Sequence, residues 1–114
     1  MIITIKGTEI ELTDALKQYV EDKFGGLTKY FDNITRAEVD IGLRTHHHKN
    51  GKIYYAEVNL HVPRKILRVV KDAEDLYKAI NKVKDHLKVE LDTMKEKMRT
   101  KNKKEIRSQK EYGL

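Results

Sequence analysis

The chain has 114 residues, of which 37 % are charged and 39 % are hydrophobic, enough for one domain with a modest core. It contains no cysteine, which excludes disulfide bonds and thiolate metal sites, and no apolar run reaches the roughly 18–20 residues that a membrane-spanning helix needs. The N-terminal residues alternate in polarity instead of forming a basic and then apolar leader. We therefore expect no signal peptide and a cytoplasmic location.

The net charge of +6 is concentrated in the last third of the chain. Residues 1–75 contain twelve basic and twelve acidic side chains, whereas residues 76–114 contain twelve basic and six acidic ones. Charge concentrated on one segment attracts a polyanion, whereas balanced charge mainly confers solubility. A lysine-rich solubilising tail is the alternative interpretation.

The first two predicted elements are a strand and a helix. Residues 1–6 alternate in polarity, which predicts a strand. Residues 11–24 carry apolar side chains at helical spacing, and Thr13 or Asp14 can cap this helix. The pair Gly25-Gly26 lowers helix propensity and predicts a bend or break there.

Three further strands are predicted in the middle of the chain. Residues 36–44 and 53–62 alternate strictly, and an Asn-Gly pair between them predicts a hairpin. Pro63 ends the second of these strands, and residues 64–71 supply another. Gly42, inside a strand, predicts a bulge.

The last predicted element is a long amphipathic helix that starts at Asp72 or Asp75. Its apolar stripe steps by three or four residues: Leu76, Ile80, Val83, Leu87, Leu91, Met94 and Met98. Beyond about Thr100 little remains to be buried. We therefore expect a domain over residues 1–99 and a basic, flexible tail over residues 100–114.

The element order β-α-β-β-β-α predicts an α+β fold. One face of a four-stranded mixed sheet would be apolar and covered by the two helices. A right-handed crossover through the first helix would make the first two strands parallel, and the other neighbours would be antiparallel.

Basic side chains on the long helix form the first candidate site. Four of them lie within about 60° of one another on a helical wheel, beside the apolar stripe: Lys84, Lys88, Lys95 and Arg99. Lys78 and Lys82 form a second cluster on the far side. A row of ammonium groups can bind successive phosphates and release counterions. The alternative is a solvated helix surface with pairs of opposite charge four residues apart.

Histidines and aromatic residues suggest weaker candidates. His46, His48 and His61 could hold a metal ion, but a loop tip with incidental metal affinity is the simpler interpretation, and we expect neither a metal site nor a cofactor. Among the aromatic residues, only Tyr55 is predicted to face outward, where it could stack on a base. The others are assigned to the core or its rim: Phe24, Phe31, Tyr54 and Tyr77.

The sequence offers few candidates for a catalytic site. The sequence contains no glycine-rich phosphate loop, no His-Glu metal motif and no nucleophile elbow. Glu38, Asp40 and Glu57 could cluster on the open face of the sheet, but acids on an exposed strand are usually only solvated. We therefore expect no enzyme and no small-molecule substrate.

Two separated motifs resemble the ribosome hibernation promoting factor family, which includes protein Y. The first comprises Gly7 and the pattern LTDAL..YV..K...L.KYFD over residues 12–32, and the second is DLYKAI over residues 75–80, which opens the long basic helix. The resemblance covers about residues 2–99. It departs from the family pattern at His86 and Val89, where the family commonly has lysine and arginine.

This resemblance implies a domain shaped like a double-stranded RNA-binding domain. It also implies a non-enzymatic inhibitor that binds ribosomal RNA of the small subunit in the channel for tRNA and mRNA. Some members promote dimers of 70S ribosomes, and the chain resembles the short form, which lacks a C-terminal dimerisation domain.

We expect rRNA contacts from basic residues of both helices: Lys82, Lys84, Lys88, Lys95, Lys97 and Arg99 of the long helix, with Lys23 and Lys29 of the first as lesser contacts. The alternative function is a protein-interaction module that regulates a partner through the open sheet face or an exposed strand edge. Neither alternative involves a membrane.

Overall fold

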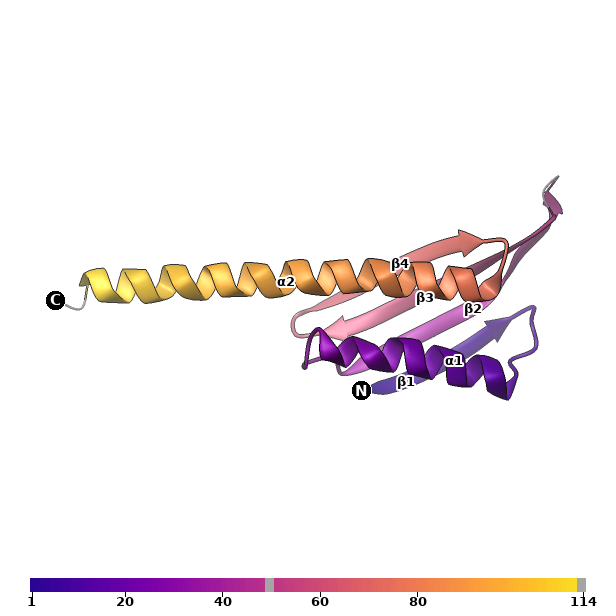
Figure 1. The fold of residues 1–114 in the computed structure, drawn as a ribbon, viewed down its shortest axis with the longest axis horizontal. Coiled ribbons are helices and arrows are strands. Elements are labelled where there is room, and N and C mark those ends of the chain that lie inside the picture. The colour runs from indigo at the N-terminus through magenta and orange to yellow at the C-terminus, as the bar shows by residue number, and fades with distance from the viewer. Residues whose placement is uncertain (49–50, 113–114) are drawn as a thin grey trace.

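The computed structural model describes the backbone of residues 1–48 and 51–112 and the side chains of residues 1–44 and 51–100. The elements follow the predicted order (Figure 1): β1 (Ile2–Thr8), α1 (Asp14–Gly25), the short 3₁₀ helix η1 (Gly26–Lys29), β2 (Arg36–His48), β3 (Gly51–Val62), β4 (Lys65–Ala73) and α2 (Leu76–Tyr112). The strands form one sheet in the order β1-β2-β3-β4. β1 is parallel to β2, and the other neighbours are antiparallel.

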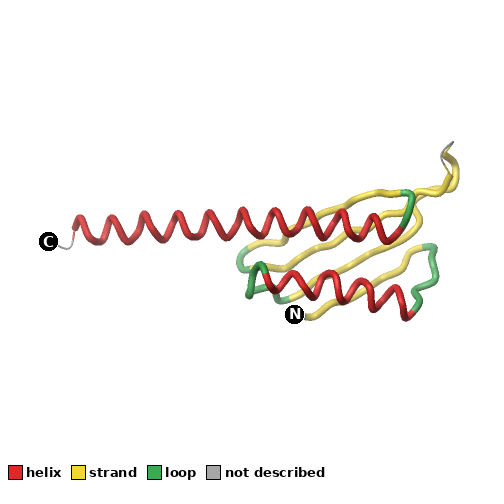
Figure 2. Tube along the Cα trace, viewed as in Figure 1, coloured by secondary structure: helices red, strands yellow, loops and turns green. Residues whose placement is uncertain are grey.

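Both helices cover the same face of the sheet, as Figure 2 shows. The side chains between the two layers are fully buried, and each such side chain contributes about 1.5–3 kcal/mol to stability. The largest come from both helices, η1 and the two central strands: Val20, Phe24, Leu27, Ile41, Val58, Leu60, Ile80, Val83, Leu87 and Leu91. Among the side chains that are described, none of the buried ones is polar. The predicted α+β fold is confirmed, and apolar burial fixes both helices on the sheet.

The predicted cap and end of α1 and the predicted end of β3 are confirmed, whereas β3 begins at Gly51, two residues before its predicted start. Thr13 is the N-cap of α1, and its side chain accepts a hydrogen bond from the Leu16 amide at 3.2 Å. The α-helix ends at Gly25 and continues as η1, where the glycine pair predicted a break. β3 ends at Val62, directly before Pro63.

Gly42 does not mark a bulge, contrary to our expectation. It pairs in register with Tyr55, and the irregularity of the β2–β3 ladder begins only after Leu43. A Cβ atom at position 42 would lie 2.3 Å from the carbonyl oxygen of Thr8 on β1. Glycine is therefore required because the β1 backbone approaches β2 closely here.

The helix α2 is longer than the sheet that it covers, and its C-terminal part projects beyond the sheet (Figure 1). The sequence predicted an end near Thr100, but the helix continues to Tyr112. Lysine, arginine, glutamate and glutamine dominate this segment and have high helix propensity even without a core to contact. The flexibility of residues 100–114 stays a prediction. No helix in the described part of the chain is long and apolar enough to cross a membrane.

Candidate nucleic-acid interface

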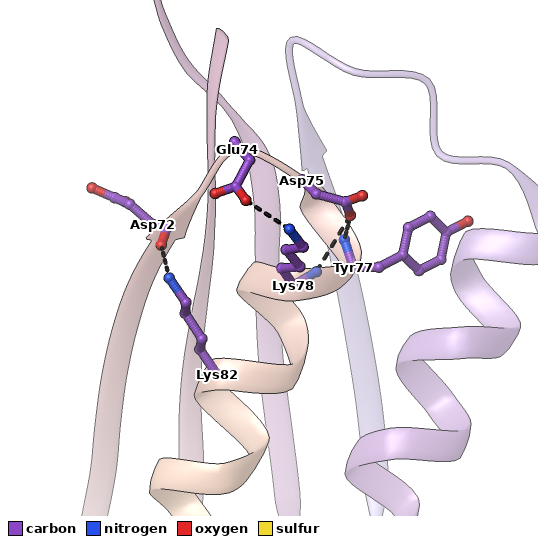
Figure 3. Close-up of polar contacts among 6 residues, drawn as sticks. All are labelled: Asp72, Glu74, Asp75, Tyr77, Lys78 and Lys82. Carbon is purple, nitrogen blue, oxygen red and sulfur yellow. Dashed lines mark hydrogen bonds and ion pairs between the residues drawn. The ribbon is translucent and has the colours of Figure 1, made fainter. Parts of the chain in front are cut away.

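The first turn of α2 sets the direction in which its basic side chains point. Asp75 is the cap, because its carboxylate accepts hydrogen bonds from the amides of Tyr77 at 2.7 Å and Lys78 at 3.4 Å (Figure 3). Asp72, the other predicted cap, is the last-but-one residue of β4. The cap and the buried stripe together fix the rotation of α2 about its axis.

This rotation divides the exposed part of α2 into two sides. In Figure 3 the ring of Tyr77 points toward α1, whereas the side chain of Lys82 points toward β4. Lys82 Nζ donates a hydrogen bond to the Asp72 carbonyl oxygen at 3.1 Å. The basic residues of α2 therefore have different surroundings according to their side of the helix.

Contacts between α1 and α2 identify the side that faces α1. The Tyr19 hydroxyl donates a hydrogen bond to Asn81 Oδ1 at 2.9 Å, and the Tyr19 and Tyr77 rings meet edge to face at 4.7 Å. Lys84 and Lys88 follow Tyr77 and Asn81 at helical spacing and thus project on the same side. This arrangement places two of the predicted lysines along the line where the helices meet.

Two aromatic rings hold lysine ammonium groups along this line. Lys88 Nζ lies 5.1 Å from the centre of the Tyr30 ring, and Lys23 Nζ lies 5.3 Å from that of Tyr19. Cation–π contacts at exposed sites contribute about 0.5–1 kcal/mol each. They restrain the ammonium groups, and no described carboxylate lies at ion-pair distance from either of them.

Toward the C-terminal end of α1, a pocket of about 270 Å³ is lined by cations from η1 and from α2. Lys29 of η1 lies on one side, and Lys95 and Arg99 of α2 lie on the other. The remaining lining residues are Tyr30, Phe31, Asp32, Asn33 and Met98. We call the six basic residues on this side of the molecule the basic seam: Lys23, Lys29, Lys84, Lys88, Lys95 and Arg99.

The basic seam is poorly neutralised. Of the ion pairs among described side chains, only one involves it, between Arg99 and Glu96 at 3.3 Å. That contact joins two exposed residues of one helix, where such pairs contribute little. The geometry therefore leaves a row of cations that can bind an anion.

Lys82 and Lys97, the other two predicted contacts, do not lie on the basic seam. Each is two residues from a seam lysine, and positions two apart on a helix face different directions. His86 and Val89, the departures from the family pattern, line a groove with Lys82 and Lys71 on the β4 side. Both departures are therefore away from the seam.

Two aromatic residues differ in part from their predictions. Tyr55 is on the open sheet face as expected, but its hydroxyl donates to Asp40 at 3.0 Å and the Arg44 guanidinium lies 4.9 Å from its ring centre. Tyr77, assigned to the core or rim, is 43 % exposed beside α1. Its place on the helix, seven residues before Lys84 and off the apolar stripe, was the available signal.

The structure gives no new support to the metal hypothesis. The side chains of His46 and His48 lie outside the described residues, and the ring of His61 contacts Glu38 on the neighbouring strand. Within the described side chains no three metal-binding groups converge. Glu57, one of the acids that could have clustered on the open face of the sheet, pairs with Arg68 at 2.6 Å.

Among the residues whose side chains are described, two sites show shifted pKa values, and both lie away from the basic seam. Burial and a hydrogen bond with Asp40 raise the pKa of Tyr55 above its ordinary value of 10.0. The hydrogen bond between Lys78 and Glu74, 2.7 Å long (Figure 3), raises the pKa of the lysine and lowers that of the glutamate. These shifts keep the groups in their usual ionisation states at neutral pH.

Comparisons with known proteins agree with this fold and these motifs. The family described as "Sigma 54 modulation protein / S30EA ribosomal protein" matches residues 3–99. A ribosome hibernation promotion factor of Lactococcus lactis is 30 % identical over 109 residues, which cover 96 % of this chain and 57 % of that protein. A ribosome hibernation promoting factor of Azotobacter vinelandii is 36 % identical over 97 residues, 85 % of each chain.

A solved structure also matches. The crystal structure of the N-terminal domain of Thermus thermophilus protein Y superposes with a TM-score of 0.72 at 33 % identity, covering 82 % of this chain and 99 % of that one. The chain spans about half the length of the first curated relatives that it matches. The match over residues 3–99 confirms the resemblance seen in the two sequence motifs, and the chain belongs to the Sigma 54 modulation protein / S30EA ribosomal protein family, which includes the ribosome hibernation promoting factors.

Proposed function

We propose that this chain is a non-catalytic translation inhibitor that binds the small ribosomal subunit and keeps idle ribosomes inactive. The names of its relatives, which are ribosome hibernation factors, support this role. The finer part of the proposal is that the basic seam contacts ribosomal RNA in the channel that tRNA and mRNA would occupy. Occupation of that channel would block translation by steric exclusion.

The observation that carries the proposal is the convergence of cations from two helices. Lys29 comes from the segment after α1, and Lys95 and Arg99 come from α2, yet all three line one pocket. A pocket lined by three cations and one acid, Asp32, suits a phosphate group. Segments far apart in the sequence would thus bind the same stretch of RNA backbone.

Contacts of this kind position a protein on RNA without reading its sequence. Each lysine that neutralises a phosphate releases condensed counterions, so binding weakens steeply as salt is added. Lys82 and Lys97 would act as secondary contacts from the other side of α2. The same binding could extend to 70S ribosomes and their dimers.

The open sheet face supports the alternative function less well. Its charged side chains pair between strands. Arg44–Asp72 at 2.8 Å joins β2 and β4 across β3, and Arg68–Glu57 at 2.6 Å joins the neighbouring β4 and β3. Such internal pairs leave less charge for a partner than the basic seam does.

The test is cosedimentation with small subunits of a triple variant, Lys84→Glu, Lys88→Glu and Lys95→Glu. A matched control, Lys6→Glu, Lys17→Glu and Lys65→Glu, changes the net charge equally at exposed positions outside the seam. We expect the seam variant to lose binding and the control to retain most of it. For single seam variants, the slope of log affinity against log salt should fall by about one.

Circular dichroism must show that the seam variant is folded, because Lys88 also contacts Tyr30. A folded seam variant that still cosediments at physiological salt would refute the proposed interface. Equal losses in the two triple variants would show that total charge, rather than the seam, determines binding.

A further inference from the structure

The outer edge of β4 is a separate feature of the molecule. β4 is the last strand of the sheet and pairs on one side only, with β3. Lys82 Nζ donates to the carbonyl oxygen of Asp72, which shows that Asp72 turns its backbone away from β3. Residues two apart on an antiparallel strand turn their backbone groups to the same side. Ile66, Arg68 and Val70 therefore also direct their N–H and C=O groups outward.

The side chains around this edge differ above and below the sheet. On the open face, Ile66 is 56 % exposed and Val70 is 39 % exposed. On the helix-covered side, Lys71 and Lys82 line a groove of about 480 Å³ between β4 and α2. The remaining lining residues are Asp85, His86 and Val89, the last of which is 63 % exposed.

A chain that adds to this edge as a strand would present alternate side chains to these two surfaces. One set would contact Ile66 and Val70, which favours apolar residues. The other set would enter the groove beside Lys71 and Lys82, which favours carboxylates. His86 is held by Glu90 at 2.9 Å, so the two lysines dominate the charge of the groove, with Asp85 as the one acid among its lining residues.

The charge of β4 argues against a second copy of the same edge as the occupant. Lys65, Arg68 and Lys71 are basic, and Asp72, its one acidic residue, pairs with Arg44 at 2.8 Å. Two such edges would bring like charges together, a common means by which proteins prevent edge-to-edge association. An acidic chain would instead meet complementary charge.

We propose that the β4 edge, from Ile66 to Val70, binds an extended acidic segment of a partner protein as a fifth strand. In this segment apolar residues alternate with acidic ones. The acidic residues point into the groove lined by Lys71 and Lys82. This site lies on the side of α2 opposite the basic seam, and Lys82, a secondary contact in the proposed function, is the one proposed RNA contact that it shares.

The first experiment uses a short synthetic peptide that alternates valine with glutamate, and a control peptide that alternates valine with lysine. Amide chemical shifts and hydrogen exchange of the ¹⁵N-labelled protein are measured with each. We expect the acidic peptide to shift and protect the amides of Ile66, Arg68 and Val70. Absence of binding, equal binding of the basic peptide, or protection at another edge would refute the proposal.

Two variants test the backbone and charge contributions separately. Val70→Pro removes an outward N–H without breaking the β3–β4 ladder, because proline is tolerated at such edge positions. Val70→Thr is its control and keeps the N–H. We expect the proline variant to weaken peptide binding by at least about tenfold and the threonine variant to bind almost normally.

Lys71→Glu keeps the backbone intact and reverses one charge in the groove. This charge reversal should lower the affinity for the acidic peptide about tenfold and raise the affinity for the basic peptide. Unchanged affinity of both peptides for Lys71→Glu would contradict the proposed direction of the acidic side chains. If Val70→Pro fails to fold, Lys71→Glu still tests the proposed binding site.

Discussion

On the open face of the sheet the charged side chains pair with one another, whereas on the basic seam they do not. Arg44 pairs with Asp72, Arg68 pairs with Glu57, and His61 contacts Glu38. Lys84, Lys88 and Lys95 of the seam have no carboxylate at ion-pair distance among the described side chains. One face thus satisfies its charges within the fold, and the other retains them for an anionic partner.

This comparison explains why net charge alone is a poor guide to the binding surface. On the open face, Glu38 and Glu57 contact basic residues of adjacent strands, His61 and Arg68, and Asp72 of β4 pairs with Arg44 of β2 across β3. On α2, Glu90 pairs with His86 and Glu96 pairs with Arg99. Asp85 and Asp92 lie three or four residues from Lys88, but among the described side chains neither forms an ion pair with a lysine of the seam. The arrangement of acids therefore decides where a polyanion can bind.

The largest expected effect comes from the core that holds α2 in place. Leu87→Ala removes a fully buried side chain between α2 and the sheet and should lower the free energy of unfolding by about 2–5 kcal/mol. The looser seating of α2 should also weaken ribosome binding. Urea denaturation measures the first effect, and cosedimentation measures the second.

Met98→Ala is the matched control, because Met98 is on the same stripe but is 50 % exposed. Its effect on unfolding should stay within about 0.5 kcal/mol. If Leu87→Ala lowers the free energy of unfolding no more than Met98→Ala does, burial of Leu87 does not hold α2 on the sheet.

A smaller effect is expected at Gly42, which lies on β2 on the open face of the sheet. Gly42→Ala places a Cβ atom 2.3 Å from the Thr8 carbonyl oxygen and should destabilise the protein by about 1–3 kcal/mol through overpacking. Gly26→Ala is the control, because no atom lies within 4 Å of a Cβ there. Equal stability of the two variants in thermal denaturation would contradict the close approach of β1 and β2.

The ion pairs of the open face should contribute still less. Arg68→Ala should change the free energy of unfolding by roughly 0.2–1 kcal/mol, because the pair with Glu57 is largely exposed at the arginine. A double-mutant cycle with Glu57→Ala isolates the interaction. Ribosome binding should not change, and a loss as large as that from the seam variants would reverse the comparison between the two faces.

The smallest expected effect is a pH dependence at Tyr55. Its pKa is raised above 10.0 because burial and Asp40 disfavour the phenolate. The stabilisation is therefore fully present below the unfolded pKa and is lost as the pH rises through the folded pKa. Stability should fall above about pH 10, and Tyr55→Phe should reduce that fall. An identical alkaline profile for both proteins would exclude Tyr55 as its cause.

Much of the fold could be predicted from local patterns. Alternation in the strands, the Thr13 cap and the glycine pair after α1 each depend on nearby residues, and each prediction is confirmed. The role of Gly42 could not be predicted, because it depends on Thr8 of a distant strand. The helix beyond Thr100 was missed because apolar periodicity stops there while helix propensity does not.

The candidate site was predictable only in part. Periodicity grouped Lys84, Lys88, Lys95 and Arg99 on one side of a helix, and the structure places that side next to α1. Sequence periodicity could not show that Lys29 lines a pocket with Lys95 and Arg99, because this depends on how the helices cross the sheet. The exposure of Tyr77 depends on the same packing.

The central claim is that the side of the molecule carrying the basic seam faces ribosomal RNA and the open sheet face does not. The chain contains no cysteine, so Asn33→Cys beside the seam pocket and Thr4→Cys on the open face can each carry a tethered iron chelate. Hydroxyl-radical cleavage of small-subunit rRNA is then mapped for both. We expect strong, localised cleavage from position 33 and little from position 4, and strong cleavage from position 4 with none from position 33 would contradict the account.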